Sequence, residues 1–342
     1  MASPVIKLAG LLALGQFMAG TATGAERFDP ARYIPLAMTV LKVEAPSLGG
    51  RMNVGTAITV APGVVVTNCH VTRDATSIRV VKKAGQWPAV GQFADVDHDL
   101  CFLAVPAWRG TPVMFADPAS LHLYQDVVAM GFTRGAEMSL SPGEITGLHR
   151  HDGGRIIQSS TSFSSGASGG ALLDAWGRLV GVLTFRLRGN IEHYFSIPAA
   201  WILTSLPLTS DRFQPIGPLA QGEVFWERDS CCTPYFMRAS SMRSRSQWAD
   251  LLGLSEEWLG ADPDDADAWF ARGLAQSRLQ QSREAMSALA KATELAPNHA
   301  DAWFELGIAS LEARDAAAAE RARDALAGMG SKLAGKLQHM MR

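Results

Sequence analysis

The 342-residue sequence has no marked excess of charge, because 31 Lys and Arg residues oppose 33 Asp and Glu residues for a formal net charge of −2. The lack of a basic excess argues against nucleic acid as a partner, and the lack of an acidic tract argues against a cation-binding tail. Charged residues make up only 19% of the chain and apolar residues 47%, which indicates globular domains rather than disorder. This length is sufficient for two domains with separate cores.

The sequence also lacks the patterns of metal and phosphate sites. Its eight histidines show no metal-ligand spacing, and the adjacent Cys231 and Cys232 have no partner pair. The glycine-rich run at residues 166–170 does not have the P-loop pattern. We therefore expect no metal and no cofactor.

Long apolar runs are absent after the N-terminus, so no later segment is expected to cross a membrane. Residues 1–25 have the pattern of a secretory signal peptide, in which Lys7 precedes a short apolar run at 8–20 and small residues at 23–25. We expect cleavage before Glu26 and a periplasmic or secreted protein. The alternatives are an uncleaved anchor or a buried helix. An exported protein meets an oxidising environment, where disulfides form.

Residues 26–210 are predicted to form a β-rich domain. Runs of Val, Ile, Leu and Thr alternate with Gly, Pro and Asp turns, as at 57–63 and 78–82. Short strands at regular spacing indicate barrels or a sandwich rather than a parallel sheet with crossover helices. Prolines and a Ser/Arg-rich stretch follow, so residues 211–245 are predicted to be a linker with some local structure.

Three segments carry the residues of a nucleophilic hydrolase. Residues 166–170 read G-A-S-G-G and place Ser168 in a glycine turn, downstream of His70 and Asp99. A serine hydroxyl becomes nucleophilic when an imidazole accepts its proton, and a carboxylate fixes the imidazole tautomer. Ser168 is the predicted nucleophile, because among nearby serines it alone precedes Gly-Gly and follows a glycine two positions back. The backbone N–H groups of Gly166 and Ser168 are the predicted oxyanion hole.

These segments resemble those of a known family. Residues 64–71, 99–105 and 166–172, with Gln158 at the family's distance before the serine, resemble the three catalytic motifs of trypsin-like serine proteases of the bacterial HtrA/Deg type. The resemblance covers about residues 50–205 and implies a double β-barrel with the catalytic triad between the barrels. The chain departs from the family in having no recognisable PDZ domain and in its serine loop, where Asn and Pro are more usual.

The resemblance also assigns roles around the triad. His70 is the general base and then the acid, and Asp99 orients it, because an apolar run begins directly after Asp99 as in the family. Asp95 and Asp97 are the competing carboxylates. The same alignment implies that three residues line the primary specificity pocket, which has no acid at its base and favours small or medium apolar P1 residues: Phe163, Thr184 and Leu187.

Residues 246–342 have a helical pattern that repeats. Trp269 and Trp303 lie 34 residues apart, and the pairs Gly273 and Gly307 and Pro263 and Pro297 keep the same spacing. This is the period of tetratricopeptide (TPR) repeats, in which Trp fills the space between paired helices and Gly lets them approach. We predict an all-α TPR domain with a degenerate first repeat and a capping helix at 331–342. The alternative is two unrelated helical hairpins.

The repeats are predicted to bind a protein partner through a groove. In this family the following first-helix positions line the concave face: Phe270, Leu274, Phe304 and Ile308. The alternative is that these side chains pack against the β-barrel.

Cys69 and Cys101 are predicted to form a disulfide. Cys69 precedes His70 and Cys101 follows Asp99 by two residues, so backbones that bring the His and Asp side chains together also bring the cysteines within bridging distance. The alternative is two free, buried thiols.

The sequence as a whole predicts a serine endopeptidase that acts through an acyl-enzyme on protein or peptide substrates, with a TPR module that recruits them. One alternative is a catalytically silent protease fold whose repeats bind partners, although all three triad residues are kept. Another is an esterase on the same fold.

Overall fold

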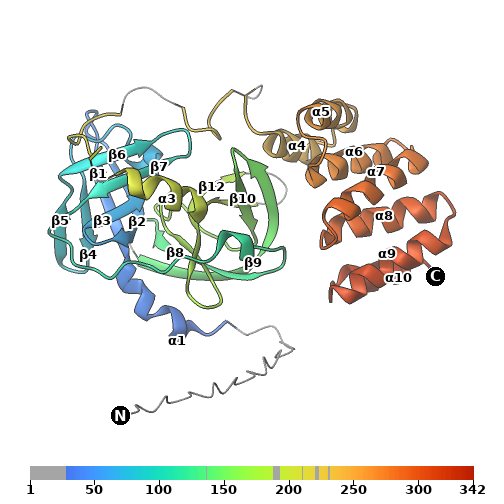
Figure 1. Cartoon of the computed structure of the whole chain (residues 1–342), viewed down its shortest axis with the longest axis horizontal. Helices are drawn as coiled ribbons and strands as arrows, with labels where there is room; N and C mark the ends of the chain where they lie inside the picture. Colours follow the sequence, from blue (N-terminus) through green and yellow to red (C-terminus); the bar gives the residue numbers. More distant parts are fainter. Residues whose placement is uncertain (1–27, 136, 188–192, 210, 220–222, 230–231) are drawn as a thin grey trace, which may run out of the picture.

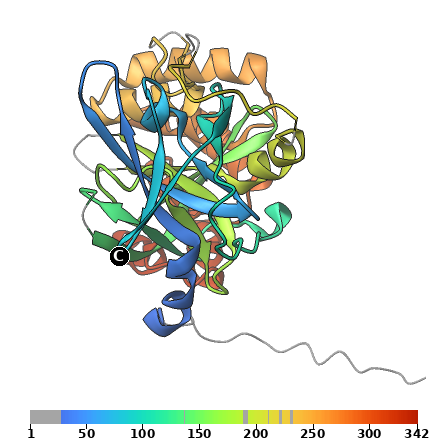
Figure 2. The same ribbon diagram turned by 90° about the vertical axis from the view of Figure 1, so that its left-hand side faces the viewer.

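The structure is a computed structural model that describes residues 28–135, 137–187, 193–209, 211–219, 223–229 and 232–342. The predicted signal peptide at 1–25 and Cys231 lie outside the described residues. A β-barrel region is followed by a stack of helices that runs along one side of it (Figure 1). In Figure 2, viewed from the side of β4 and β5, the helical stack lies behind the strands. The prediction of a β-barrel region followed by an all-helical region is confirmed.

The first half of the β region is a seven-stranded sheet in the order β5-β4-β1-β2-β3-β7-β6. All its neighbouring strands pair antiparallel, as expected from short alternating runs joined by tight turns. Its strands are β1 (Val40–Pro46), β2 (Met52–Ala61), β3 (Val64–Thr67), β4 (Arg79–Lys82), β5 (Gly85–Pro88), β6 (Gly91–Asp95) and β7 (Leu100–Ala104). A short helix, α1 (Pro30–Tyr33), precedes them.

The second half is a closed barrel in the order β10-β13-β12-β11-β8-β9. Closure removes the exposed sheet edges that a separate sheet would leave. Its strands are β8 (Asp126–Thr133), β9 (Glu137–His151), β10 (Gly154–Ser159), β11 (Ala171–Asp174), β12 (Leu179–Leu187) and β13 (His193–Pro198). Helix α3 (Ala199–Ser205) follows the last strand.

One continuous apolar core joins the two halves. Val66 and Phe102 from the first sheet belong to the same buried cluster as Met130 and Phe195 from the barrel and Trp201 from α3. Burial of each large apolar side chain contributes about 1.5–3 kcal/mol. This shared core fixes the relative position of the loops that emerge between the two halves.

The helical region repeats in structure as it does in sequence. The Trp269 indole N–H donates to the Pro263 carbonyl and the Trp303 indole N–H donates to the Pro297 carbonyl, both at 2.8 Å. The 34-residue spacing therefore relates the pair α6–α7 to the pair α8–α9. The helices are α4 (Tyr235–Ser244), α5 (Trp248–Ala261), α6 (Ala266–Arg278), α7 (Ser282–Leu295), α8 (Ala300–Glu312), α9 (Ala316–Gly328) and α10 (Leu333–Met340).

A different leucine packs against each of the two repeat glycines, Gly273 and Gly307. A Cβ atom at Gly273 would clash with Leu289 of α7, whereas a Cβ atom at Gly307 would clash with Leu337 of α10. Position 323, which is equivalent to Leu289 in the second pair, is an arginine. Leu337 is fully buried against α8, so α10 completes the core at the C-terminal end of the stack.

The segment between the two regions contains regular structure and buried side chains. Helix α4 begins at Tyr235, inside the range predicted to be a linker, and Val224 and Phe225 are each 1% exposed. None of the helices in the described residues has the length and apolar character that a membrane crossing requires.

Candidate active site

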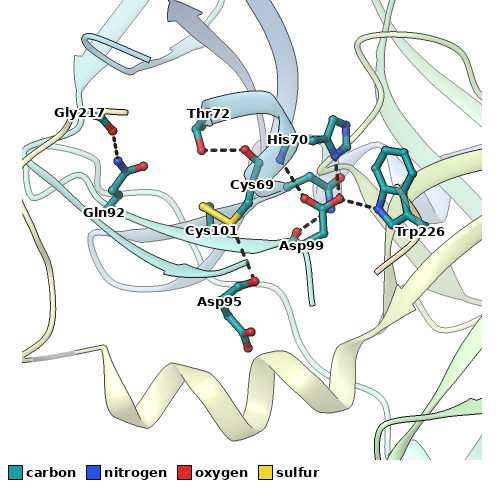
Figure 3. The surroundings of a disulfide bond; sticks show 10 residues. Cys69, His70, Thr72, Gln92, Asp95, Asp99, Cys101, Gly217 and Trp226 are labelled. Atoms are coloured by element: carbon teal, nitrogen blue, oxygen red, sulfur yellow. Dashed lines mark hydrogen bonds and ion pairs between the residues drawn. A yellow bond between two sulfur atoms is a disulfide. The ribbon is translucent and has the colours of Figure 1, made fainter. Parts of the chain in front are cut away.

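His70 and Asp99 meet where the end of β3 lies beside the start of β7. Strand β3 runs into the short helix α2 (Cys69–Thr72), which carries His70, and Asp99 occupies the turn before β7 in a left-handed conformation with φ of 56°. The Asp99 Oδ2 atom lies 2.7 Å from His70 Nδ1, and Asp99 Oδ1 accepts the His70 backbone N–H at 2.9 Å (Figure 3). The Asp99 side chain is completely buried, while that of His70 is 18% exposed. The carboxylate therefore holds both the ring and the backbone of an accessible histidine.

The two competing carboxylates have other partners. Asp95 pairs with His98 at 2.9 Å and accepts a hydrogen bond from the Ser205 hydroxyl. Asp97 pairs with Arg228 at 2.5 Å. Of the three acidic residues in this stretch, Asp99 is the one that contacts His70.

The predicted disulfide between Cys69 and Cys101 is present, with 4.8 Å between the Cα atoms. The register of β3 on β7 places Thr67, the last residue of β3, opposite Cys101, and this brings Cys69, two residues later at the start of α2, within reach of Cys101. The bond lies next to the His70–Asp99 pair (Figure 3). It cross-links the two segments that position these side chains.

The loop that carries Ser168 is held by two glycine conformations. Gly166 has a φ of +95° and Gly169 a φ of +86°, which side chains rarely adopt. A Cβ atom at either position would also clash with backbone atoms. Thr56 of β2 braces the loop, because its N–H donates to the Ser168 carbonyl at 2.8 Å and its hydroxyl donates to the Gly166 carbonyl at 2.7 Å.

The donors and the hydroxyl of this loop have distinct surroundings. The Ala167 N–H donates to the Ser164 carbonyl at 3.0 Å, whereas the N–H groups of Gly166 and Ser168 have no acceptor in the described part of the chain. The half-buried Ser168 donates its hydroxyl proton to the Thr184 carbonyl at 3.2 Å rather than to His70. Catalytic hydrogen bonds are often loose in structures without substrate and tighten when it binds.

The three residues assigned to the specificity pocket lie in different environments. Thr184 of β12 is buried beside Ser168, and its hydroxyl accepts from the Asn68 side chain at 3.3 Å. Phe163 packs against the Tyr194 ring, with 5.1 Å between centroids. Leu187, at the end of β12, lines a cavity of about 1450 Å³ between the barrel and the helices.

The predicted groove residues of the repeats divide into two pairs. Phe270 and Leu274 are buried, at 6% and 4% exposure, and line the same cavity as Leu187. The Arg243 guanidinium lies over the Phe270 ring at 5.2 Å. Phe304 and Ile308 are half-buried on α8.

A half-buried ion pair joins the barrel to the helices. His149 of β9 contacts Asp267 of α6, with 2.6 Å from Nδ1 to Oδ2, and stacks on the Phe236 ring of α4 at 4.4 Å. Burial lowers the pKa of His149, but the Asp267 carboxylate more than offsets this and leaves that pKa above its ordinary value. Burial raises the pKa of Asp267, but His149 and then His299 hold it well below its ordinary value. Nothing in the sequence marked this pair.

Three further residues around the His70–Asp99 pair, here called the dyad, were not predicted from the sequence. Thr56 braces the serine loop, Asn68 donates to the Asp99 carbonyl at 3.0 Å, and Trp226 donates to Asp99 Oδ2 at 3.1 Å. The only available signal for Trp226 was the apolar run at 224–226, which is unusual in a linker.

Comparison with known proteins finds relatives of the β region. Residues 55–182 match the trypsin-like peptidase domain family. The chain is 31% identical over 146 residues to the magnetosome formation protease MamE of Magnetospirillum gryphiswaldense, covering 39% of this chain and 19% of that protein. It is 29% identical over 180 residues to the periplasmic serine endoprotease DegP of Escherichia coli K12, covering 50% of this chain and 37% of that protein. The chain thus spans well under half the length of these relatives.

Solved structures share the fold. The HtrA-type protease AlgW with tripeptide superimposes with a TM-score of 0.50 at 23% identity, over 54% of this chain and 64% of that one. The active form of the M. tuberculosis protease Rv3671c also gives a TM-score of 0.50 at 23% identity, over 57% of this chain and 91% of that one. Residues 55–182 are therefore similar to a trypsin-like peptidase domain, and the relatives matched over this part of the chain include the periplasmic serine endoprotease DegP.

Proposed function

We propose that this protein is a serine endopeptidase in which Ser168 is the nucleophile, His70 the general base and acid, and Asp99 the residue that orients His70. The observation that carries the proposal is the double contact of the buried Asp99 carboxylate with the ring and the backbone of His70. A carboxylate at Nδ1 leaves Nε2 as the proton acceptor and stabilises the imidazolium that forms.

The reaction would follow two displacement steps. A rotation of the Ser168 hydroxyl away from the Thr184 carbonyl allows His70 to accept its proton as Oγ attacks the scissile carbonyl. The imidazolium then gives this proton to the departing amine, and the acyl-enzyme remains. Water attacks the acyl carbon, His70 accepts a proton from that water, and the proton returns to Ser168 as the acid leaves.

The N–H groups of Gly166 and Ser168 would stabilise the oxyanion in both steps. Both donors are without an acceptor in the described residues, and the positive φ of Gly166 sets the turn from which they project. Donors already oriented toward developing charge can contribute about 3–4 kcal/mol each to lowering the barrier. Phe163, Thr184 and Leu187 remain the proposed specificity residues, and small or medium apolar P1 side chains the proposed preference.

The test is the hydrolysis of unfolded casein by the full chain with Ser168→Ala. Turnover should fall by about 10⁴-fold or more, because the loss of a nucleophile removes the acyl-enzyme route. The matched control is Ser165→Ala, which removes an exposed hydroxyl from the same loop and should leave turnover unchanged. Near wild-type hydrolysis by Ser168→Ala would refute the assignment. An inactive wild-type chain would favour the scaffold alternative.

The helical region is the proposed substrate-recruiting module. We assign residues 246–342 to TPR repeats because the Trp–Pro hydrogen bond recurs at the 34-residue period and α10 closes the stack. Half-buried Phe304 and Ile308 are the proposed contacts for a protein segment. The periplasmic names of relatives such as DegP support export of this chain. The proposed organisation is a cleaved signal at 1–25, a protease domain at 26–210 and a linker at 211–245 that includes helix α4 and the segment before it.

A further inference from the structure

The segment that follows the β region returns to the His70–Asp99 pair. Residues 223–229, here called the strap, are fixed to the β region along their length. Phe225 is buried and packs its ring against Phe185 of β12, with 5.9 Å between centroids. The Glu227 carboxylate accepts two hydrogen bonds from the Arg73 guanidinium, at 2.7 and 3.0 Å. The strap is therefore anchored on both sides of its central residue, Trp226.

Trp226 contacts the dyad directly. Its indole N–H donates to Asp99 Oδ2 at 3.1 Å, on the carboxylate oxygen that also contacts His70 Nδ1 (Figure 3). The indole and the His70 ring meet edge to face, with 5.3 Å between the ring centroids and 88° between the ring planes. The indole also stacks on the Phe185 ring, with 5.2 Å between the ring centroids and 16° between the ring planes. The ring thus fills the space between the catalytic histidine and strand β12.

Asp99 needs this donor. A fully buried carboxylate is stable only when hydrogen bonds replace the water that it has lost. Its side chain accepts the backbone and ring N–H groups of His70, and Trp226 supplies the third hydrogen bond. The nearby Thr184 hydroxyl donates instead to the Val182 carbonyl.

The charged groups around the dyad are themselves paired. The positive charge of Arg73 interacts electrostatically with Asp99. The hydrogen bonds from Arg73 to Glu227 of the strap raise the pKa of the Arg73 guanidinium. Asp97 pairs with Arg228, which also belongs to the strap. Glu227 and Arg228 of the strap thus pair with Arg73 and Asp97 from the two segments that carry His70 and Asp99.

We propose that Trp226 is a positioning residue that fixes the rotamer and the charge distribution of Asp99. Trp226 lies outside residues 55–182, which match the peptidase domain, and it supports the dyad from there. This inference rests on the proposed endopeptidase function. Loss of the indole N–H leaves the Asp99 charge concentrated toward the imidazole and its rotamer less restrained. The imidazolium then releases its proton less readily, and His70 is oriented less well.

The test compares full-length Trp226→Phe with the matched control Trp176→Phe, which changes an exposed indole 65% accessible to solvent. Trp226→Phe keeps an aromatic ring against Phe185 but removes the N–H. On a short peptide ester, kcat should fall about 10-fold, as for loss of a hydrogen bond to a charged group. The acidic limb of the kcat/KM profile should move to higher pH, and the downfield proton resonance of His70 Nδ1–H should shift. Trp176→Phe should match the wild type in all three.

Each outcome has a defined reading. Unchanged kcat in Trp226→Phe, or a reduced kcat with an unshifted or downward-shifted pH profile, would overturn the positioning role while leaving the endopeptidase assignment intact. An inactive wild-type chain would instead overturn the proposed function. If Trp226→Phe does not fold, the double variant Arg73→Ala with Glu227→Ala removes the ion pair that anchors the strap without leaving an unpaired charge near Asp99, and it should lower kcat and shift the same limb to higher pH by a smaller amount. An unshifted limb in that variant would equally overturn the inference.

Discussion

The contact between His149 and Asp267 should make the attachment of the helices to the barrel depend on pH. Asp267→Asn keeps the shape of the side chain but removes its charge. A hydrogen bond between charged partners contributes about 1.5–3 kcal/mol to the free energy of unfolding, and an Asn side chain retains part of this contribution. We therefore expect the variant to be less stable by about 1–2 kcal/mol at pH 6.5, which is about 2–8 °C in the unfolding midpoint.

The sign of the pH dependence follows from the shifted groups. The pKa of His149 is raised, so its contribution is fully present below the ordinary histidine pKa of 6.5 and is lost as pH rises through the raised value. The pKa of Asp267 is lowered, so its contribution is present above 3.8 and is lost only in strong acid. The difference between wild type and Asp267→Asn should therefore shrink as pH rises from 6.5 to about 9.

Two neighbouring groups titrate outside this window. Burial and the nearby Asp267 raise the pKa of Asp265 to about 6 from 3.8, so its unfavourable contribution is present above that value and is lost as pH falls from about 6 to 3.8. Burial and then Arg243 lower the pKa of His193 below its ordinary value. A window that starts at pH 6.5 therefore leaves out most of the titration of Asp265 and His193.

The assay is thermal unfolding followed by circular dichroism at pH 6.5 and 9. Asp264→Asn is the matched control, because it removes an exposed charge from the loop just before α6 and should parallel the wild type. A constant difference between Asp267→Asn and wild type across the window would refute the reasoning, as would no difference at pH 6.5.

Two further predictions concern the disulfide and the repeats. Replacing Cys69 and Cys101 together by Ala should lower the free energy of unfolding by about 3–4 kcal/mol, because the bond closes a loop with a sequence separation of 32; equal denaturant midpoints for this variant and the oxidised wild type would contradict this. Phe304→Ser with Ile308→Ser should slow hydrolysis of casein but not of a short peptide, whereas Met340→Ser, on α10, should slow neither. Unchanged casein hydrolysis in the double variant would count against the recruiting role.

The contact between His70 and Asp99 could be predicted from the sequence because it depends on short segments. Each of these residues lies in a short run that resembles a catalytic motif, and the proximity of Cys69 to Cys101 follows from the need for His70 to reach Asp99. The division into strands and helices follows from hydrophobic period, since runs with period two form strands and the 34-residue pattern forms helix pairs.

Contacts between distant segments could not be predicted in this way. Trp226 lies 127 residues from Asp99, and His149 lies 118 residues from Asp267. Neither pair has a local pattern, because the tertiary packing of the strap and of α6 brings the partners together. The repeat period correctly marked Gly307, but its contact is Leu337 of α10 rather than a residue equivalent to Leu289.

Covalent labelling of the full-length protein with a fluorophosphonate, followed by mass spectrometry of its peptides, tests the assignment of Ser168 as nucleophile most directly. We expect one adduct, on Ser168, that is absent in His70→Ala because the hydroxyl then has no base to accept its proton. An unlabelled wild-type protein, or an adduct on another serine that persists in His70→Ala, would contradict this assignment.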